Sequence, residues 1–311
     1  MATTRPSTPR TTRLGRSRPP ADVSPAQVPL AVWPVAQTSA QYQRAGRYLP
    51  ACTAHPGKML PSLAARIVTD YSTPGQLVLD PMCGIGTTLI EAATRDRRAI
   101  GVEVETRWTE LALANLEAVL TPEQCLSVEV RTGDAQQLTL VMRDTVGFVD
   151  LIVISPPYAC DAGIIDKPGW KAGGRLCPSD TLNYSTDRGN VGHARGAAYE
   201  AAMSGIYAGC LTLLRPGGLL VTVTKNTRRR GRTFDLAGAT VLLAQTAGFT
   251  YLQHAIALHA AIRDSGLRGR PSFWQLTQHR HAARRGEPAH LVVHEDVSVF
   301  TKPGPSTGVS Q

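Results

Sequence analysis

Apolar residues recur at two different spacings between about residue 59 and residue 300. Spacings of three and four residues, as at positions 60, 63, 64, 67 and 68, predict helices, and short continuous apolar runs predict buried strands. The predicted helices cover residues 60–68, 87–96, 108–120, 197–214 and 234–247. The predicted strands cover residues 77–79, 99–102, 128–130, 149–154, 219–223, 249–258 and 291–300. Strands separated by single helices predict an α/β fold with a mostly parallel sheet and helices on both faces.

Four segments do not follow this alternation. Residues 1–40 are rich in Pro, Ser, Thr, Arg and Ala without a periodic apolar face, which predicts a disordered basic tail. Residues 159–195 are polar and glycine-rich and residues 263–289 are basic, and loops of this length are usually functional or disordered. We therefore expect one domain over residues 41–302, with loop insertions at 159–195 and 263–289, followed by a disordered tail over residues 303–311.

The net charge of +9 is unevenly distributed. Residues 1–20, 228–232 and 263–285 together hold fifteen arginines and one aspartate, so the rest of the chain has a net charge of −5. An acidic globule with basic appendages suits a polyanionic partner such as nucleic acid. The alternative is a solvated surface in a chain that uses 28 arginines against five lysines. Charge alone does not decide between them.

The bulk properties exclude several classes of protein. No apolar run approaches the roughly 18–20 residues that cross a bilayer, and no signal-peptide core follows the N-terminus, so we expect no membrane association. The six cysteines include no Cys-x-x-Cys pair, so we expect neither a zinc site nor a redox couple. Reduced, scattered thiols are typical of a cytoplasmic protein. The oligomeric state is left open.

A glycine-containing turn follows the first predicted strand, with the sequence Asp80-Pro-Met-Cys-Gly-Ile-Gly86. Ligands of open α/β sheets bind at the carboxyl ends of the strands, and Gly84 and Gly86 let the backbone approach a ligand closely. A dinucleotide fingerprint would need a third glycine at position 89, where the chain has Leu89, and no Gly-Lys-Ser/Thr of a P-loop follows. The alternative interpretation is a tight strand–helix turn without a ligand.

Carboxylates stand at the ends of the next two strands. Glu103 ends the second strand, where it can accept hydrogen bonds from ribose hydroxyls, and Asp134 follows the third, where it can meet an adenine amino group. Each acid alone is more often a solvated residue at a strand end. Suitable groups at three successive strand ends favour a nucleoside-containing cofactor.

The tetrapeptide Ser155-Pro-Pro-Tyr158 follows the fourth strand. An exocyclic amine on a base is a poor nucleophile because its lone pair is delocalised into the ring. Two acceptors, the Ser155 hydroxyl and the Pro156 carbonyl, could hold the N–H bonds and localise that pair, which is electrostatic preorganisation. Tyr158 could stack on a base flipped out of a helix. The alternative is an ordinary Pro-Pro turn, but its position beside a cofactor site favours function.

These motifs together resemble those of the S-adenosylmethionine-dependent DNA amino-methyltransferases, which modify cytosine N4 or adenine N6. Asp80–Thr88 resembles the first motif of that family, and His55-Pro-Gly-Lys-Met-Leu-Pro61 resembles the motif before its core helix. The resemblance covers about residues 55–302 and implies a Rossmann-like class I methyltransferase fold with a seven-stranded sheet. It implies S-adenosylmethionine as the cofactor, with its methionine end at the glycine turn, its ribose on Glu103 and its adenine on Asp134.

The resemblance assigns two sets of residues. Those expected to bind the cofactor are Lys58, Asp80, Pro81, Cys83, Gly84, Gly86, Thr87, Thr88, Glu103 and Asp134. Those expected to be catalytic are Ser155, Pro156, Pro157 and Tyr158.

The polar and basic segments are expected to bind the nucleic acid. Candidate residues are Asn183, Tyr184, Arg188, Arg228, Arg229, Arg230 and Arg232. Asn183, Tyr184 and Arg188 could equally belong to ordinary turns. No segment has the usual size of a separate target-recognition domain, which leaves 159–195 and 263–289 as the candidates for that role.

The substrate is predicted from the first residue of the tetrapeptide. Serine is commoner there in cytosine-N4 enzymes of the family, and Asp or Asn in adenine-N6 enzymes, so we expect a site-specific DNA methyltransferase with a preference for cytosine N4. Carbon-5 methylation is disfavoured because it needs a nucleophilic Cys and the chain has no Pro-Cys dipeptide. Two alternatives stay open: an RNA base amino-methyltransferase, and a non-catalytic nucleic-acid-binding protein on the same fold.

Overall fold

A computed structural model describes residues 29–157, 171–172, 175–176, 189–194, 196–229, 232–271, 273–287 and 290–304. The chain divides into two compact units, Met1–Ala31 and Val32–Gln311. The described part of the first unit is residues 29–31, and the α/β fold belongs to the second unit.

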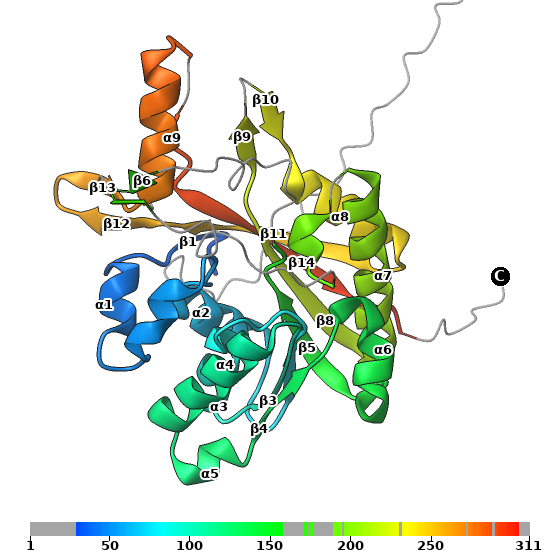
Figure 1. Ribbon diagram of the computed structural model, residues 1–311. Helices are drawn as coiled ribbons and strands as arrows, with labels where there is room; N and C mark the ends of the chain where they lie inside the picture. The colour runs from blue at the N-terminus through cyan, green and yellow to red at the C-terminus, as the bar shows by residue number, and fades with distance from the viewer. Residues whose placement is uncertain are drawn as a thin grey trace, which may run out of the picture. The chain divides into compact units, whose positions relative to one another are not determined.

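The second unit is built on one eight-stranded sheet with the order β1-β11-β14-β8-β5-β2-β3-β4 (Figure 1). Its strands are β1 (Val32–Pro34), β2 (Leu77–Asp80), β3 (Arg98–Glu103), β4 (Val128–Thr132), β5 (Val149–Ile154), β8 (Leu214–Thr224), β11 (Thr250–Leu258) and β14 (His294–Thr301). Strand β14 is antiparallel to both of its neighbours, and the other neighbouring pairs are parallel. The predicted mostly parallel Rossmann-like sheet is therefore confirmed.

The predicted count of seven strands is wrong because β1 adds an eighth. This strand lies within residues 1–40, which the composition predicts to be disordered. It pairs in parallel with β11, and the side chain of Trp33 is only 3% exposed. The guanidinium of Arg66 lies over the Trp33 ring at 5.2 Å. A three-residue strand ending in proline has no periodic pattern, so burial of this indole could not be predicted from composition.

Helices cover both faces of the sheet (Figure 1). They are α1 (Ala40–Arg44), α2 (Pro61–Tyr71), α3 (Thr87–Ala93), α4 (Thr106–Val119), α5 (Pro122–Cys125), α6 (Leu138–Val141), α7 (Ala197–Leu213), α8 (Leu236–Thr246) and α9 (Phe273–Arg284). Short 3-10 helices span Pro50–Ala54, Ala135–Gln137, Arg143–Thr145 and Val191–His193. The five helices predicted from apolar spacing correspond to α2, α3, α4, α7 and α8.

Two apolar cores lie on opposite faces of the sheet. Leu63 of α2 packs in one core with Val153, whereas Ile206 of α7 packs in the other with Ile152. Successive strand residues point to opposite faces, so both Ile152 and Val153 are buried. This burial on both sides explains why the strand sequences are continuously apolar rather than alternating.

The segment 263–289 is not a loop insertion. It holds the end of strand β12 (Ala260–Arg263), strand β13 (Gly266–Gly269) and helix α9. Strands β12 and β13 form an antiparallel hairpin, and Gly266, which directly follows its two-residue turn, has a positive φ of +103°. The strands are too short and polar to give a period-two signal, which is why the prediction of a loop is wrong.

Most of the other predicted insertion, 159–195, lies outside the described residues. Its described parts are the two-residue strands β6 (Lys171–Ala172) and β7 (Arg175–Leu176), which pair with each other, and residues 189–194. A further hairpin, β9 (Thr227–Arg229) and β10 (Arg232–Phe234), follows β8.

A group of buried polar side chains joins β8 to β14. Thr222 pairs in register with Ser298, and Thr224 pairs with Asp296. Each of the four is at most 7% exposed. The hydroxyls of Thr222, Thr224 and Ser298 and the Oδ2 atom of Asp296 have no hydrogen-bond partner within the described part of the chain. An unsatisfied buried polar group costs about 1–3 kcal/mol of stability.

Replacing Thr222 by valine should therefore stabilise the protein. The Thr222→Val change exchanges an unpaired hydroxyl for a methyl group of similar volume, and we expect the free energy of unfolding to rise by about 1 kcal/mol. Urea denaturation of the full chain measures this change. Thr222→Ala is the control, because loss of the methyl group as well leaves a cavity and should lower stability. Destabilisation by valine would show instead that an ordered water binds the hydroxyl.

Candidate active site

The glycine turn joins the carboxyl end of β2 to the start of α3. Gly84 has φ +52° and Gly86 has φ +82°, both in the left-handed region that favours glycine. A Cβ atom at Gly84 would lie 3.0 Å from Nε2 of His55. Both conformation and close packing therefore require glycine at position 84.

Glu103 holds this turn in place. Its Oε2 accepts a hydrogen bond from the Gly84 N–H at 2.9 Å, and its Oε1 accepts one from the Glu105 N–H at 3.0 Å. The side chain is 8% exposed at the end of β3. Each carboxylate oxygen keeps a second lone pair for a ligand hydroxyl. The ribose contact implied by the family resemblance stays a prediction, whereas the contact with the turn is present in the structure.

Two buried carboxyls make this end of the sheet suited to a cation. Burial raises the pKa of Asp80 to about 6, although the Thr88 side chain and the Met82 N–H lower it in part. Burial raises the pKa of Glu103 to about 7, against the lowering effect of the Glu105 and Gly84 amides. The charges of Glu105 and Asp80 raise the pKa of Glu103 further. A positively charged ligand would favour the ionised form of both acids.

His55 and Trp108 form an aromatic wall beside the turn. Their ring centroids are 4.6 Å apart at an interplanar angle of 66°, and they are 7% and 6% exposed. The guanidinium of Arg107 lies 4.4 Å above the Trp108 ring. Burial is the main cause that lowers the pKa of His55 to about 4, so the imidazole is neutral near pH 7. The sequence analysis did not identify Trp108 as a site residue. Its position in the first turn of α4, close after the strand-end acid Glu103, could have indicated it.

Asn115 fixes the segment before α2 to the glycine turn. Its Oδ1 accepts from the Leu49 N–H at 3.0 Å, and its Nδ2 donates to the Ile85 carbonyl at 3.0 Å. The side chain is completely buried. This residue was not predicted from the sequence either. Its signal was a polar residue on the apolar face of α4, beside Ala112 and Leu116.

The other predicted cofactor residues lie around the same turn. The Lys58 ammonium donates to the His55 carbonyl. Cys83 is 6% exposed, and a Cβ atom at Gly101 would lie 2.7 Å from its Sγ. Glycine is therefore needed at position 101, and the side chain at position 83 must be small. Thr87 and Thr88 are buried at the start of α3. Pro81 directly follows Asp80 and is buried as well.

Asp134 follows β4 and caps the 3-10 helix Ala135–Gln137 by accepting from the Gln136 N–H at 2.8 Å. Strands β2, β3 and β4 are parallel neighbours, so Asp80, Glu103 and Asp134 stand along one edge of the sheet. The structure therefore brings the three predicted acids together at the carboxyl ends of these parallel strands, called here the carboxyl edge of the sheet.

The tetrapeptide begins immediately after β5, the neighbour of β2. Within the described residues, neither the Ser155 hydroxyl nor the Pro156 carbonyl has a hydrogen-bond partner, so both acceptors remain available. The Pro157 carbonyl accepts from the Tyr199 hydroxyl of α7 at 3.1 Å. Tyr158 lies outside the described residues.

Asn190 connects the cofactor side to the tetrapeptide side. Its Nδ2 donates to Oε1 of Glu105 at 3.1 Å, and its Oδ1 accepts from the Gly192 N–H at 2.8 Å. A Cβ at Gly192 would lie 3.3 Å from Cβ of Pro157. Asn190 is thus a buried residue that bridges the two sides of the site.

Part of the predicted nucleic-acid site can be located. Arg228 and Arg229 lie on β9 and Arg232 on β10, in the hairpin that follows the carboxyl end of β8. Asn183, Tyr184, Arg188 and Arg230 lie outside the described residues.

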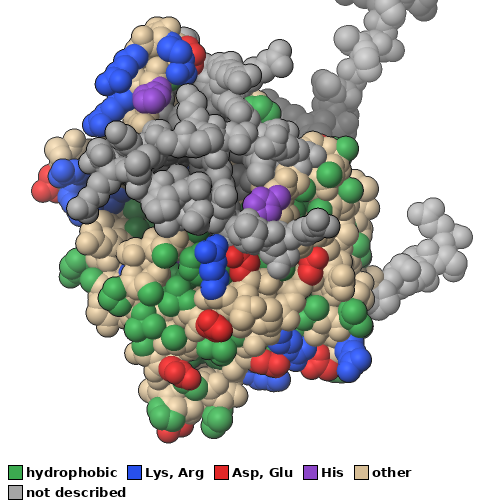
Figure 2. All heavy atoms as spheres, viewed as in Figure 1, with side chains coloured by type: hydrophobic (Ala, Val, Ile, Leu, Met, Phe, Trp, Pro, Cys, Tyr) green, Lys and Arg blue, Asp and Glu red, His purple; other side chains and the backbone are tan. Residues whose placement is uncertain are grey.

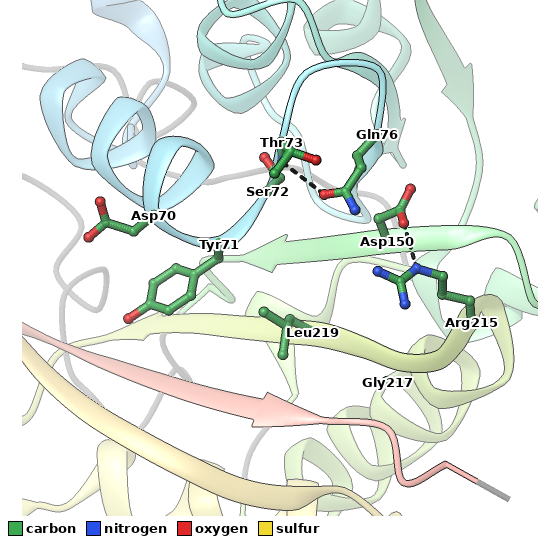
Figure 3. A pocket seen from close by; sticks show the side chains of 9 residues that line it. All are labelled: Asp70, Tyr71, Ser72, Thr73, Gln76, Asp150, Arg215, Gly217 and Leu219. Atoms are coloured by element: carbon green, nitrogen blue, oxygen red, sulfur yellow. Dashed lines mark hydrogen bonds and ion pairs between the residues drawn. The ribbon is translucent and has the colours of Figure 1, made fainter.

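A cavity of about 240 Å³ opens at the opposite edge of the sheet (Figure 3). It is lined by Asp70, Tyr71, Ser72, Thr73, Gln76, Asp150, Arg215, Gly217 and Leu219. Figure 3 shows the Arg215 guanidinium paired with Asp150. Its Nε lies 2.5 Å from Oδ1 of Asp150. No predicted site residue lines this cavity, so we assign the chemistry to the carboxyl edge instead.

Two features are absent from the part of the chain that the structure describes. There, no helix is long and apolar enough to span a bilayer. No group of three His, Cys, Asp or Glu side chains is placed to hold a metal ion among the same residues.

Part of the chain is similar to methyltransferases that act on nucleic-acid bases. The model of a family described as DNA methylase, with N6 and N4 specificity in its name, matches residues 16–114. A tRNA (guanine(10)-N2)-dimethyltransferase of Methanocaldococcus jannaschii is 36% identical over 106 residues, which are 33% of this chain and 30% of that protein. The DNA adenine methyltransferase YhdJ of Escherichia coli is 29% identical over 102 residues, 33% of this chain and 32% of that protein. The chain thus spans about a third of the length of these relatives.

Among solved structures, TrmN from Thermus thermophilus aligns with a TM-score of 0.47 and 18% identity, over 83% of this chain and 53% of that one. The sequence matches confirm the predicted resemblance to the amino-methyltransferase family. The family match implies S-adenosylmethionine as the cofactor. The buried carboxyls and the glycine at position 84 fit that cationic ligand.

The pKa of Glu103 predicts how cofactor binding depends on pH. A cationic sulfonium and ribose hydroxyls favour the ionised carboxylate, so binding should lower its pKa from about 7 and release a proton. Affinity should then rise from pH 5.5 to pH 8, by up to about tenfold per pH unit below the pKa. Calorimetry in buffers of different ionisation enthalpy measures both quantities.

Glu103→Gln should reduce this pH dependence to the part that Asp80 contributes with its pKa of about 6, whereas Asp134→Asn should retain the full dependence because Asp134 is not a buried acid. An affinity that is independent of pH in the unaltered chain would contradict the assignment of Glu103 as the titrating group.

Proposed function

We propose that this chain transfers a methyl group from S-adenosylmethionine to an exocyclic amino group of a DNA base, preferably N4 of cytosine and secondarily N6 of adenine. The observation that carries the proposal is the adjacency of two sites. The glycine turn follows β2 and the Ser155-Pro156 pair follows β5, and these strands are parallel neighbours. A methyl donor and an amine acceptor would therefore meet at one edge of the sheet.

The chain's own residues would hold and activate the amine. The Ser155 hydroxyl and the Pro156 carbonyl accept its two N–H bonds and draw the nitrogen towards tetrahedral geometry, which localises its lone pair. S-adenosylmethionine supplies an electrophilic methyl group when bound. The new N–C bond would form as the C–S bond breaks, the thioether S-adenosylhomocysteine would leave, and the amine would release one proton to solvent.

The hydrogen bond from Tyr199 to the Pro157 carbonyl holds the acceptors in position. Because proline fixes φ, the two prolines also limit the conformations that this stretch of backbone can adopt. Preorganised acceptors need no reorientation when charge develops on the nitrogen, which is why they accelerate the chemical step. Tyr158 would stack on the flipped base.

An RNA base is the second candidate substrate. The relative from Methanocaldococcus jannaschii, a tRNA (guanine(10)-N2)-dimethyltransferase by name, is 36% identical over its matched segment. Its named reaction also methylates an exocyclic amine, so the same acceptor pair would serve either substrate. Serine at position 155 favours cytosine in DNA, and the product decides between the candidates.

Product analysis tests the activity. Incubation with labelled cofactor and separate DNA and RNA pools, followed by nucleoside mass spectrometry, should give N4-methylcytosine in DNA. N6-methyladenine would correct the base, and a product confined to RNA would support the second candidate. No methylated nucleoside under any condition would favour a non-catalytic binding protein.

Ser155→Ala should lower kcat by about 100-fold, the typical effect of removing one preorganised hydrogen-bonding group, with little change in cofactor affinity.

Tyr158→Ala should also retain cofactor binding and lose most methyl transfer, because base stacking is worth about 1–3 kcal/mol. Single-turnover rates and calorimetry separate these effects. Equal kcat values for Ser155→Ala and the unaltered chain would remove Ser155 from the mechanism.

The arginines of the β9–β10 hairpin should contribute to nucleic-acid affinity, and this contribution should weaken as the salt concentration rises. Replacing Arg228, Arg229, Arg230 and Arg232 by glutamine should reduce the slope of log affinity against log salt by up to about 0.9 for each phosphate that the arginines neutralise. Fluorescence anisotropy at several salt concentrations measures the slope. Cofactor affinity should not change. An unaltered slope would assign these arginines to a solvated surface.

A further inference from the structure

A long connection joins β11 to β14 at the edge of the sheet that carries the candidate active site. Strand β14 is antiparallel to both β11 and β8, and β8 is parallel to β5, so β11 points the same way as β5. Residues 259–293, which connect β11 to β14, therefore leave the sheet at the edge where Ser155 stands. Figure 1 shows α9 projecting from this connection.

We propose that this connection, named here the basic arm (residues 259–293), binds duplex DNA with the exposed face of α9 in the major groove. The proposal rests on the proposed function and deepens it, because it assigns the surface that selects a DNA duplex as the substrate. The β9–β10 hairpin is a separate element that follows a different strand.

The basic arm is anchored to the sheet unit by defined contacts. Nη2 of Arg263 donates to the Gln37 carbonyl at 2.8 Å, and Nη2 of Arg270 donates to the same oxygen at 3.3 Å. Nε2 of His259 lies 3.0 Å from Oε2 of Glu295 on β14. Two of the six arginines of the arm therefore serve in attachment, and the hairpin base is fixed rather than free to swing.

Part of the remaining charge lies on one face of α9. Arg280, His281 and Arg284 are exposed, and Arg280 and Arg284 are one turn apart on the same side. Ala282 is 7% exposed and points to the opposite side of the helix, where Gln275 donates to the Val292 carbonyl. Figure 2 shows Lys and Arg side chains gathered around the projecting helix. One face of α9 is thus packed and the other is basic and open.

No acidic side chain neutralises Arg280 or Arg284 within the described residues. The acids of the arm are Asp264, in the hairpin turn, and Glu287, which pairs with Arg285 at 2.7 Å. Exposed arginines without acidic partners favour phosphate oxygens, which Arg binds in a bidentate manner. The charge of this face is therefore complementary to a nucleic-acid backbone.

The shape of the arm favours DNA over double-stranded RNA. A helix of 12 residues is about 18 Å long, and a helix fits the major groove of B-DNA, which is about 12 Å wide. The major groove of A-form RNA is deep and narrow, and side chains cannot read it. A projecting basic helix can therefore enter a DNA duplex but not an RNA duplex.

The test measures binding of the full chain to a fluorescent 20-base-pair DNA duplex across a range of KCl concentrations. Arg280→Gln combined with Arg284→Gln keeps helix propensity and removes two charges. We expect the slope of log affinity against log salt to fall by about 1.8, and the affinity at low salt to fall at least about tenfold. Circular dichroism and cofactor affinity should be unchanged.

The matched control is Arg98→Gln combined with Arg143→Gln. These arginines are exposed near the amino-terminal edge of the sheet, so the same loss of charge should leave the slope unaltered. A duplex RNA of the same sequence should bind more weakly than DNA and respond less to the α9 substitutions.

Each other result would overturn the proposal. An unaltered slope in the α9 variant would assign this face to solvent, and equal losses for DNA and RNA would leave phosphate binding without groove recognition. Self-association that depends on the exposed Ile262–Leu267 pair of the hairpin would assign the arm to a second copy of the chain. Binding is measured without methyl transfer, so a failure of the proposed activity is recognised separately by the absence of methylated nucleosides.

Discussion

The candidate site depends on one buried carboxylate. Glu103 accepts the Gly84 N–H with one oxygen and the Glu105 N–H with the other, at 2.9 and 3.0 Å. These two bonds connect the turn after β2 to the start of α4. Glu105 then accepts from Asn190, whose own Oδ1 holds Gly192 against Pro157. A continuous set of contacts therefore runs from the glycine turn to the Ser-Pro-Pro segment.

This connection explains why the two halves of the site stay in register. The glycine turn and the Ser155 segment follow different strands, so sheet pairing alone fixes only their backbone origins. The bridge through Asn190 fixes the loops beyond the strands, and the Tyr199 hydroxyl fixes the same segment from α7. A methyl transfer needs its two reacting groups aligned within a fraction of an ångström, so such bracing would contribute directly to the rate.

The sequence predicts the parts of the site that are local in the chain. Asp80, Glu103 and Ser155 each stand where an apolar strand ends, so strand periodicity was enough to place them on one edge. It could not reveal the contacts of Asn115 and Asn190, because their partners lie 66 and 85 residues away in the chain. Strand β1 was not predicted because its burial depends on pairing with β11, which is also distant in the chain. The sequence revealed the charge of the basic arm but not its structure, because α9 is rich in polar residues and has little apolar periodicity. Its stability comes from attachment, here through Gln275 and the anchored hairpin, rather than from an amphipathic face.

The buried acids impose a cost on the protein without ligand. The pKa values of Asp80 and Glu103 rise to about 6 and 7 on folding, so ionising these groups opposes the folded state. The folded state is therefore most stable with respect to these two acids below about pH 4, where both are protonated. This stability is lost as the pH rises through the folded-state pKa values of about 6 and 7. At neutral pH a bound cation would relieve this repulsion and desolvation. The bound ligand would therefore stabilise the folded protein by RT ln(1 + [L]/Kd). Because only a positively charged ligand offsets the burial of the two acids, their burial would favour such a cofactor over a neutral or anionic one.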